Sequence, residues 1–363
     1  MEILLLPKYG RKAASCRYRF LQYVPYLESL GIKCTISPLF DDDYLEKKYQ
    51  TGRNDVVDVA KAFFRRLMTI VHLHKYDLVV IHCEMFPYLP PLFERYLILR
   101  KIKYIFDYDD AIFHNYDQSP NMIMRWLFKE KIITAIEGAK YVIAGSQYLA
   151  DYALRANKNV EVIPTVIDIN KYPVRKLCPA PAETFTIGWI GSPSTAKYVE
   201  EIGTALSEIC DNDNTKIILI GAGRVNLPGV NYENLEWSEE SEITNMQLFD
   251  VGIMPLSDGL WEKGKCGFKL IQYMACGLPV VASPVGVNSM LVEEGKNGFL
   301  VKTIEDWVRV LSILRDDRAL RQRLGECGRK IIENQYCLQV TAPRYIALMQ
   351  NIIKENTNES PRN

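Results

Sequence analysis

Two segments of this sequence bring glycines, hydroxyls and lysines together just before an expected helix. The residues are Gly191, Ser192 and Lys197 in the first segment and Lys265 and Lys269 in the second. Backbone N–H groups at a helix start hydrogen-bond phosphate oxygens, and lysine ammonium groups balance their charge. The two segments therefore predict a site for a phosphate-bearing ligand. In the first segment, capping of the helix by Ser192 is the alternative role.

A third segment, 103–114, carries acidic side chains and a histidine after an apolar run. If the run is a buried parallel strand, Asp110 and His114 follow its carboxyl end, where α/β proteins place ligand chemistry. A carboxylate there could accept hydrogen bonds from sugar hydroxyls, and the imidazole could donate to a developing anion. The alternatives are that Asp110 caps the next turn beside an ordinary His114, or that carboxylates hold a metal ion.

The order of expected elements indicates two domains. Apolar runs of strand length alternate with helix-length periodic segments. In the first half, strands are expected at 3–6, 34–40, 77–83, 141–146 and 160–165, and a further strand lies within 103–114 together with the loop that follows it. Six strands that alternate with helices specify a doubly wound parallel sheet, so 1–172 is predicted to be one Rossmann-like domain. Prolines then concentrate at 173–183, which is predicted to be a linker.

The alternation starts again in the second half, and 184–337 is predicted to be a second Rossmann-like domain. A helix over 268–275 is expected to end at Gly277, because glycine commonly follows a helix. The run 279–283 is expected to be a buried parallel strand. Its carboxyl end opens into Val285 and Gly286, whose amides would face the same ligand.

The motif G-F-K-L-I-Q-Y-M-A-C-G-L-P-V-V-A-S-P-V-G at 267–286, followed by G-K-N-G-F-L-V at 295–301, resembles the donor-binding core of glycosyltransferase family 4. The resemblance implies the GT-B fold, in which two Rossmann-like domains face an interdomain cleft. It implies retaining, metal-independent transfer of a sugar from a nucleotide-sugar donor. It also implies that the last helix, expected at 338–355, crosses back to the first domain. The remaining residues, 356–363, are expected to be a polar, disordered tail.

The resemblance also assigns roles to single residues. Family members usually neutralise the donor diphosphate with two cations, here Lys197 with Lys265 or Lys269. The nucleotide base lies along the segment that holds Trp237, although a core tryptophan is an equal alternative. Asp110 or His114 would lie beside the donor sugar.

Two glutamates that family members carry eight residues apart are missing. The second falls on Gln272, which would still hydrogen-bond the ribose, and the first falls near Gly264. Asp258 is the expected substitute for the first.

The basic amino-terminal half suggests two further contacts. Gly10 lies in the cation-rich loop after the first expected strand, where doubly wound domains meet ligands; a solvated basic turn is the alternative. The segment 122–138 is amphipathic, aromatic and basic. It could lie on the inner membrane surface, or it could be a core-facing helix with a solvated face.

Composition excludes several classes of protein. Lys+Arg and Asp+Glu both total 44, so no net charge attracts nucleic acid. Nine scattered cysteines without a C-x-x-C pair argue against disulfides and zinc and indicate a reducing compartment. No apolar run has membrane-spanning length, and a cytoplasmic protein is expected, free or peripheral at the membrane. Neither a metal nor a cofactor is expected beyond the UDP- or GDP-linked donor.

These observations predict a retaining glycosyltransferase. The acceptor is expected to be a hydroxyl of a glycan or lipid-linked glycan of a bacterial envelope. The alternatives are a non-catalytic sugar-nucleotide-binding subunit, which the missing glutamates favour, or another GT-B enzyme such as a sugar-nucleotide epimerase.

Overall fold

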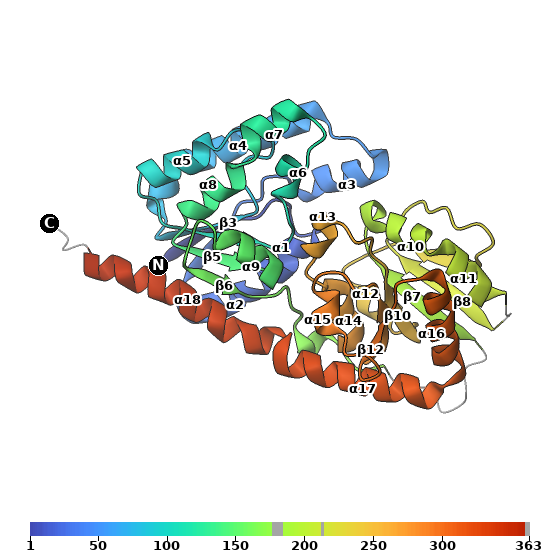
Figure 1. Cartoon of the computed structure of the whole chain (residues 1–363). Coiled ribbons are helices and arrows are strands. Elements are labelled where there is room, and N and C mark those ends of the chain that lie inside the picture. The colour runs from blue at the N-terminus through green and yellow to red at the C-terminus, as the bar shows by residue number, and fades with distance from the viewer. Residues whose placement is uncertain (176–183, 212–213, 360–363) are drawn as a thin grey trace. The chain divides into compact units, whose positions relative to one another are not determined.

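The computed structural model describes residues 1–175, 184–211 and 214–359 (Figure 1). The chain divides into two compact units. Unit 1 comprises Met1–Val166, Gly264–Cys266 and the chain from Leu338 onward, and unit 2 comprises Ile167–Lys263 and Gly267–Cys337. Most of the predicted linker, 176–183, lies outside the described residues, as do 360–363 of the predicted tail.

Unit 1 is a parallel sheet with helices on both faces. Its strands are β1 (Glu2–Leu6), β2 (Lys33–Ile36), β3 (Leu78–His82), β4 (Tyr104–Tyr108), β5 (Tyr141–Ala144) and β6 (Val160–Val162). Its α-helices are α1 (Ala14–Arg19), α2 (Val24–Ser29), α3 (Asp42–Thr51), α4 (Val56–Val71), α5 (Leu92–Leu99), α6 (His114–Asp117), α7 (Met122–Phe128), α8 (Lys131–Glu137), α9 (Gln147–Ala153) and α18 (Leu338–Glu359). Two 3₁₀ helices are η1 (Leu21–Tyr23) and η2 (Leu73–Lys75).

The strand order of unit 1 is β2-β1-β3-β4-β5-β6, and every pairing is parallel. The central strands β3 and β4 are buried along their whole length, as their continuous apolar runs predict. From β2 onward the chain steps in one direction along the sheet. Right-handed crossovers therefore put α4, α5 and α7 on one face.

Unit 2 repeats this plan. Its strands are β7 (Phe185–Ile190), β8 (Thr215–Ile220), β9 (Tyr232–Leu235), β10 (Val251–Met254), β11 (Val280–Ala282) and β12 (Gly298–Leu300). Its α-helices are α10 (Lys197–Glu201), α11 (Gly203–Cys210), α12 (Glu242–Met246), α13 (Leu260–Lys263), α14 (Phe268–Ala275), α15 (Asn288–Leu291), α16 (Ile304–Asp316) and α17 (Arg318–Gln335). Two 3₁₀ helices are η3 (Ile169–Lys171) and η4 (Pro193–Thr195).

The strand order of unit 2 is β12-β11-β10-β7-β8-β9, again all parallel. Trp189 and Trp307 are fully buried in its core. The two predicted doubly wound sheets are therefore confirmed. Because β7, β10 and β11 are neighbours, the loops that follow them emerge at the same edge of the sheet.

One local prediction was wrong. The single helix expected over 122–138 is two helices, α7 and α8, separated at Lys129 and Glu130. Elsewhere in the unit, aspartates cap the helices. The Asp41 side chain accepts from the backbone N–H of Tyr44 at the start of α3, and Asp55 caps α4.

The segment between β1 and β2 forms three short helices, α1, η1 and α2. Phe20 leaves the helical region after α1, and Pro25 lies in the first turn of α2. None of the helices in the described part of the chain is both long enough and apolar enough to cross a membrane.

Candidate functional site

The loop after β7 in unit 2 holds the first predicted phosphate-binding residues. A Cβ on Gly191 would lie 2.4 Å from the Trp189 ring and 2.9 Å from the Thr195 hydroxyl, so the position requires glycine. Ser192 and Thr195 form a capping box at the start of η4. The predicted capping role of Ser192 is therefore present, and it fixes the loop against the helix start.

Two predicted cations lie close to aromatic rings of the same unit. The Lys269 ammonium is 5.5 Å from the centroid of the Trp189 ring, the ring that Gly191 also approaches. Lys197 is exposed, with its ammonium 4.8 Å from the ring centroid of Tyr198. A ring face holds an ammonium group without neutralising its charge.

Trp237 follows β9 at this same edge. A Cβ on Gly221, at the end of β8, would lie 2.5 Å from the Gly191 carbonyl and 3.0 Å from the Trp237 Cβ. The three residues therefore lie close together. The Trp237 indole is half-buried, and its N–H donates to Glu242 at 2.8 Å. That hydrogen bond fixes the ring at the sheet edge.

The loop after β11 is built around Gly286. Its φ is +53°, and a Cβ would lie 2.6 Å from the Lys263 carbonyl oxygen. Val285 is buried, and its N–H already donates to the Ser283 carbonyl at 2.8 Å. The predicted Val285 amide contact to a ligand would have to share that bond.

The residues predicted to replace the missing glutamates differ in environment. Gln272 is 4 % exposed, and its side-chain N–H donates to the Tyr172 hydroxyl at 3.2 Å. Asp258 is 74 % exposed at its side chain and forms an ion pair with Lys263 at 3.3 Å. Gln272 is thus held in place, whereas Asp258 is solvated.

In unit 1, the predicted cation Lys265 and the predicted sugar-contacting Asp110 are bonded to each other. The ammonium donates to Asp110 Oδ1 at 2.9 Å. Burial alone would lower the pKa of Lys265, but the charge and hydrogen bond of Asp110, together with the nearby charge of Asp109, raise it. The adjacent Gly264 packs against Ala111, where a Cβ would lie 2.4 Å from the alanine methyl.

His114, at the start of α6, has partners on both ring nitrogens. Nδ1 is 2.8 Å from Asp117 Oδ1, and Nε2 is 2.8 Å from the Tyr148 hydroxyl. The ring is therefore oriented by the protein, and its contact with a sugar would replace the bond to Tyr148. Gly10, after β1, is buried, and a Cβ there would lie 2.5 Å from Asp42 Oδ1.

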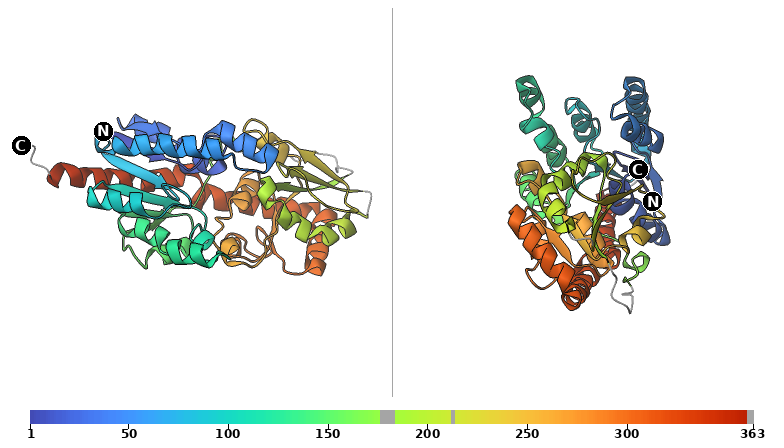
Figure 2. Two further views of the ribbon diagram at one scale, coloured as in Figure 1. Left: turned by 90° about the horizontal axis from the view of Figure 1, so that it is seen from above. Right: turned by 90° about the vertical axis from the view of Figure 1, so that its right-hand side faces the viewer.

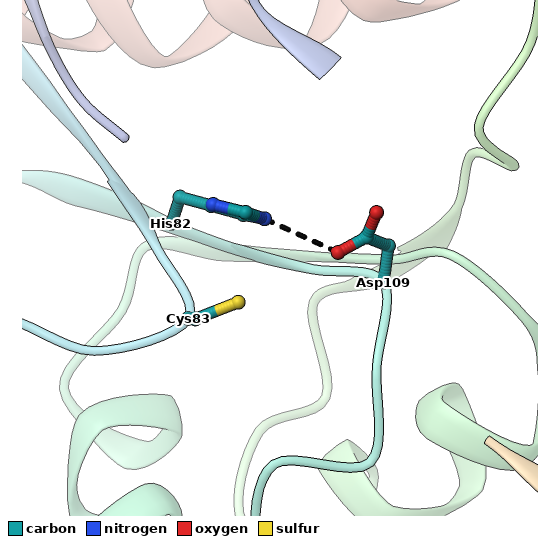
Figure 3. Close-up of side chains that lie close together, drawn as sticks. All are labelled: His82, Cys83 and Asp109. Carbon is teal, nitrogen blue, oxygen red and sulfur yellow. Dashed lines mark hydrogen bonds and ion pairs between the residues drawn. The ribbon is translucent and has the colours of Figure 1, made fainter. Parts of the chain in front are cut away.

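Sequence reasoning missed the buried ionisable residues at the carboxyl edge of this sheet. Figure 3 shows His82 pointing at Asp109, with Nε2 3.2 Å from Oδ1 and the Cys83 sulfur beside them. Burial opposes both charges, but the contact with His82 holds the pKa of Asp109 down to about 2, and Cys83 together with Asp109 raises the pKa of His82. Arg19 and Lys265 also lower the pKa of Asp109.

The same three side chains bear on metal binding. In the described part of the chain, one cluster of possible metal ligands is found, formed by His82, Cys83 and Asp109. One ligand atom from each residue lies within 4.8 Å of the other two. The positive charges of Arg19 and Lys265 near Asp109 would oppose a cation there. We therefore treat the group as an internal ion pair.

Two further buried ion pairs lie nearby. Arg19 donates to both carboxylate oxygens of Asp107 at 2.7 Å, and both residues are buried. Lys131 donates to Glu84 at 2.9 Å, and Lys8 lies 3.4 Å from the same carboxylate. The signal in the sequence was a charged residue inside an apolar strand, as at Asp107, because such a residue needs a buried partner.

The structure thus brings together Gly191, Lys269 and Trp237 through Trp189 and Gly221, all in unit 2, and Asp110 with Lys265 in unit 1. His114, Gly10, Asp258 and Gln272 each have a separate local partner.

Comparison with known proteins places the chain in a family. Residues 184–317 match the model of "Glycosyl transferases group 1", and residues 26–171 match that of "Glycosyltransferase Family 4". The chain belongs to these glycosyltransferases. The resemblance predicted from the 267–301 motif is confirmed.

Individual relatives are distant. The chain is 21 % identical over 293 residues to N-acetyl-alpha-D-glucosaminyl L-malate synthase of Bacillus anthracis, covering 68 % of this chain and 76 % of that one. HepE from Anabaena, solved with UDP-glucose, has a TM-score of 0.69 at 18 % identity, covering 97 % and 99 % of the two chains. WaaG, a glycosyltransferase of lipopolysaccharide biosynthesis, has a TM-score of 0.68 at 13 % identity, covering 95 % and 98 %. These likenesses confirm the GT-B fold of this glycosyltransferase.

Proposed function

We propose that this glycosyltransferase moves a sugar from a UDP- or GDP-linked donor to a hydroxyl of a glycan or lipid-linked glycan, with retention of anomeric configuration and without a metal. The observation that carries the proposal is the edge of unit 2, where Lys269 and Gly191 meet at Trp189. A glycine-lined helix start beside an ammonium suits a diphosphate. Crystallisation of HepE with UDP-glucose supports a nucleotide-sugar donor for the fold.

In the proposed reaction the protein supplies charge and position rather than covalent chemistry. The acceptor oxygen bonds the anomeric carbon on the face from which the diphosphate departs. The acceptor proton passes to the departing phosphate oxygen. Lys197 and Lys269 neutralise the negative charge that develops there, with amides at Gly191, Ser192 and Gly286. The side-chain oxygen of Gln272 accepts from a ribose hydroxyl while its nitrogen bonds Tyr172.

Lys265 is the weaker candidate for the diphosphate. Its ammonium already bonds Asp110, so contact with a phosphate would replace or share an existing partner. Lys269 instead lies beside the Trp189 ring, which Gly191 of the loop after β7 also approaches. We therefore assign the second cation of the donor site to Lys269. We assign Asp110 and His114 to positioning of the sugar.

A cytoplasmic, envelope-building role completes the proposal. The nucleotide-sugar is a cytoplasmic metabolite class, and a lipid-linked acceptor would be met at the inner face of the membrane. WaaG acts in lipopolysaccharide biosynthesis, and its likeness to this chain is one of fold. The acceptor is therefore assigned by class alone.

A thermal-shift screen against UDP, GDP, CDP, ADP and their sugar conjugates tests the donor. A nucleotide at a hundred times its dissociation constant should stabilise the protein by about 2.7 kcal/mol. A shift with one nucleotide that is the same with magnesium or with a chelator supports the proposal. If none of the nucleotides shifts the melting temperature, the donor site proposed in unit 2 is wrong.

A second candidate is a sugar-nucleotide-binding subunit without turnover. It is favoured by Gln272 and Gly264 at the positions where family members usually carry glutamates. Slow hydrolysis of the bound donor, followed by release of free sugar, would contradict it. A Gln272→Glu variant that gains transfer or hydrolysis, while the wild type binds but does not turn over, would favour it.

A further inference from the structure

The outward surface of α4, α5 and α7 in unit 1 is unusually apolar for a surface in contact with water. Figures 1 and 2 show the three helices next to one another on one side of the unit. They carry 14 of the 26 large apolar side chains that are exposed in the described chain, although they have only 31 residues. The 14 are Val56, Val57, Phe64, Leu67, Met68, Val71, Leu92, Tyr96, Ile98, Leu99, Met122, Ile123, Trp126 and Leu127.

The exposed residues follow helical spacing. Leu92, Tyr96 and Leu99 recur along α5 at i, i+4 and i+7, and they are 61 %, 40 % and 80 % exposed. Trp126 of α7 is 76 % exposed. Stripes of this kind normally face a core, whereas these side chains are exposed, which is typical of an interaction surface.

The charge of the same surface is positive. Residues 56–71, 92–103 and 122–130 contain nine Lys and Arg against three Asp and Glu, a net charge of +6. Because the whole chain is neutral, the rest carries −6. Lys61, Arg95 and Lys101 are exposed between the apolar side chains. Apolar and aromatic residues mixed with cations are the chemistry that binds an anionic bilayer surface.

A groove extends this surface. Phe64 and Met68 of α4 line it together with Thr35 of the edge strand β2 and Ser37 just after that strand. Arg65 and His72 also lie at its wall. The groove holds about 570 Å³. Apolar side chains beside cations suit an acyl chain below a negative headgroup.

We infer that this outer helical surface, formed by the exposed residues of α4, α5 and α7, docks on an anionic lipid bilayer. A second copy of the chain fits less well, because a symmetric contact would place +6 against +6. The surface is larger than the one segment, 122–138, that the sequence suggested. The inference stands on unit 1 alone and does not rest on the proposed sugar transfer.

Sedimentation of the full-length protein with vesicles tests the inference. Vesicles of phosphatidylcholine with a third of phosphatidylglycerol should bind the protein, and pure phosphatidylcholine should bind it far less. Each cation near the surface contributes a factor of about five, so the triple variant K61A/R95A/K101A should lower the partition coefficient about 100-fold. The matched control K302A/R323A/K330A replaces exposed cations of unit 2 and should leave binding unchanged.

The apolar contribution is tested separately. F64S/L99S/W126S changes three side chains that are 65 % to 80 % exposed, so it should fold, and it should lower binding about tenfold or more. The control Met290→Ser alters an equally exposed residue of unit 2. Circular dichroism and the melting curve of every variant show whether it folds as the wild type does.

Three results would overturn the inference. The first is equal binding to charged and neutral vesicles. The second is vesicle binding that neither triple variant weakens. The third is a self-association of the wild type that F64S/L99S/W126S abolishes while vesicle binding persists, which would make the surface a protein interface.

Discussion

The carboxyl edges of the two sheets carry opposite kinds of side chain. In unit 1 the edge is occupied by buried ions that already have partners, as in Arg19 with Asp107 and His82 with Asp109. In unit 2 the edge after β7, β8 and β11 consists of glycines, hydroxyls and lysines. An ion pair between half-buried Arg175 and buried Asp250 lies at the other end, just before β10.

This difference assigns different tasks to the two edges. A buried charge is tolerated only with a partner, so the edge of unit 1 is fixed by its own ion pairs. Backbone amides and ammonium groups at the edge of unit 2 gain most from negative charge that a ligand brings. Substitutions at the first edge should therefore cost stability, and those at the second should chiefly cost binding.

Asp107→Asn should have the largest effect. It leaves the Arg19 guanidinium buried without a counter-charge, which costs about 3 to 5 kcal/mol of unfolding free energy. Urea unfolding followed by circular dichroism measures the change. Asp306→Asn removes a solvent-exposed ion pair with Arg309 and serves as the control, with no measurable change expected. Equal stabilities for the two variants would contradict the comparison.

Gly286→Ala should have the second largest effect, because the loop after β11 at the edge of unit 2 requires a glycine at this position. The left-handed φ costs about 1 to 2 kcal/mol for alanine, and the contact with the Lys263 carbonyl adds about 1 to 3 kcal/mol of crowding. Gly295→Ala has a φ of +69° but nothing within 4 Å of its Cβ, so it isolates the backbone cost. The difference between the two melting curves measures the crowding. Equal melting temperatures for the two variants would mean that the loop around Gly286 shifts to accommodate the added methyl group.

Lys269→Ala should leave stability nearly unchanged and weaken binding of the diphosphate. Loss of a hydrogen bond to a charged group costs about 1.5 to 3 kcal/mol, or roughly ten- to 150-fold in dissociation constant. Calorimetric titration with the nucleotide found in the thermal-shift screen measures this. Lys330→Ala, also a lysine of unit 2, should bind as the wild type does. An unchanged affinity of Lys269→Ala would remove this residue from the donor site.

The His82–Asp109 pair should give the smallest effect, visible as a pH dependence. The raised pKa of His82 means that its contribution is complete below pH 6.5 and is lost as pH rises through the raised value. The lowered pKa of Asp109 means that its contribution is complete above 3.8 and is lost as pH falls toward about 2. The stability difference between wild type and H82Q/D109N should thus be greatest between 3.8 and 6.5. A difference independent of pH would show that the pair is not charged.

The sequence predicted those helices whose bounds depend on the spacing of apolar residues and on a local glycine or proline. The helix at 268–275 and the glycine that ends it were predicted to the residue, because apolar spacing and Gly277 both act locally. It failed at 122–138, where no glycine or proline marks the break. There the helix is interrupted next to Lys131, whose ammonium is bonded to Glu84 and to the Phe86 carbonyl. A contact between residues 47 apart leaves no local pattern.

The candidate site shows the same limit. The glycines and lysines of unit 2 were recognisable, because their roles follow from the loop in which each lies. Lys265 and Asp110 were each assigned to a ligand, yet they lie 155 residues apart and bond one another. Pairing of charges depends on which strands become neighbours. Such pairings could be suspected from Asp107 and His82 inside apolar strands, but their partners could not be named.

Helix α7 has a consequence for amide exchange. Of its seven residues only Phe128 is buried, so local unfolding of this helix exposes little buried surface to water. Its backbone amides should therefore exchange with deuterium long before those of the buried strands β3 and β4, which need a much larger opening. Comparison of α7 exchange with and without vesicles would then report, at the level of single peptides, when that helix is covered.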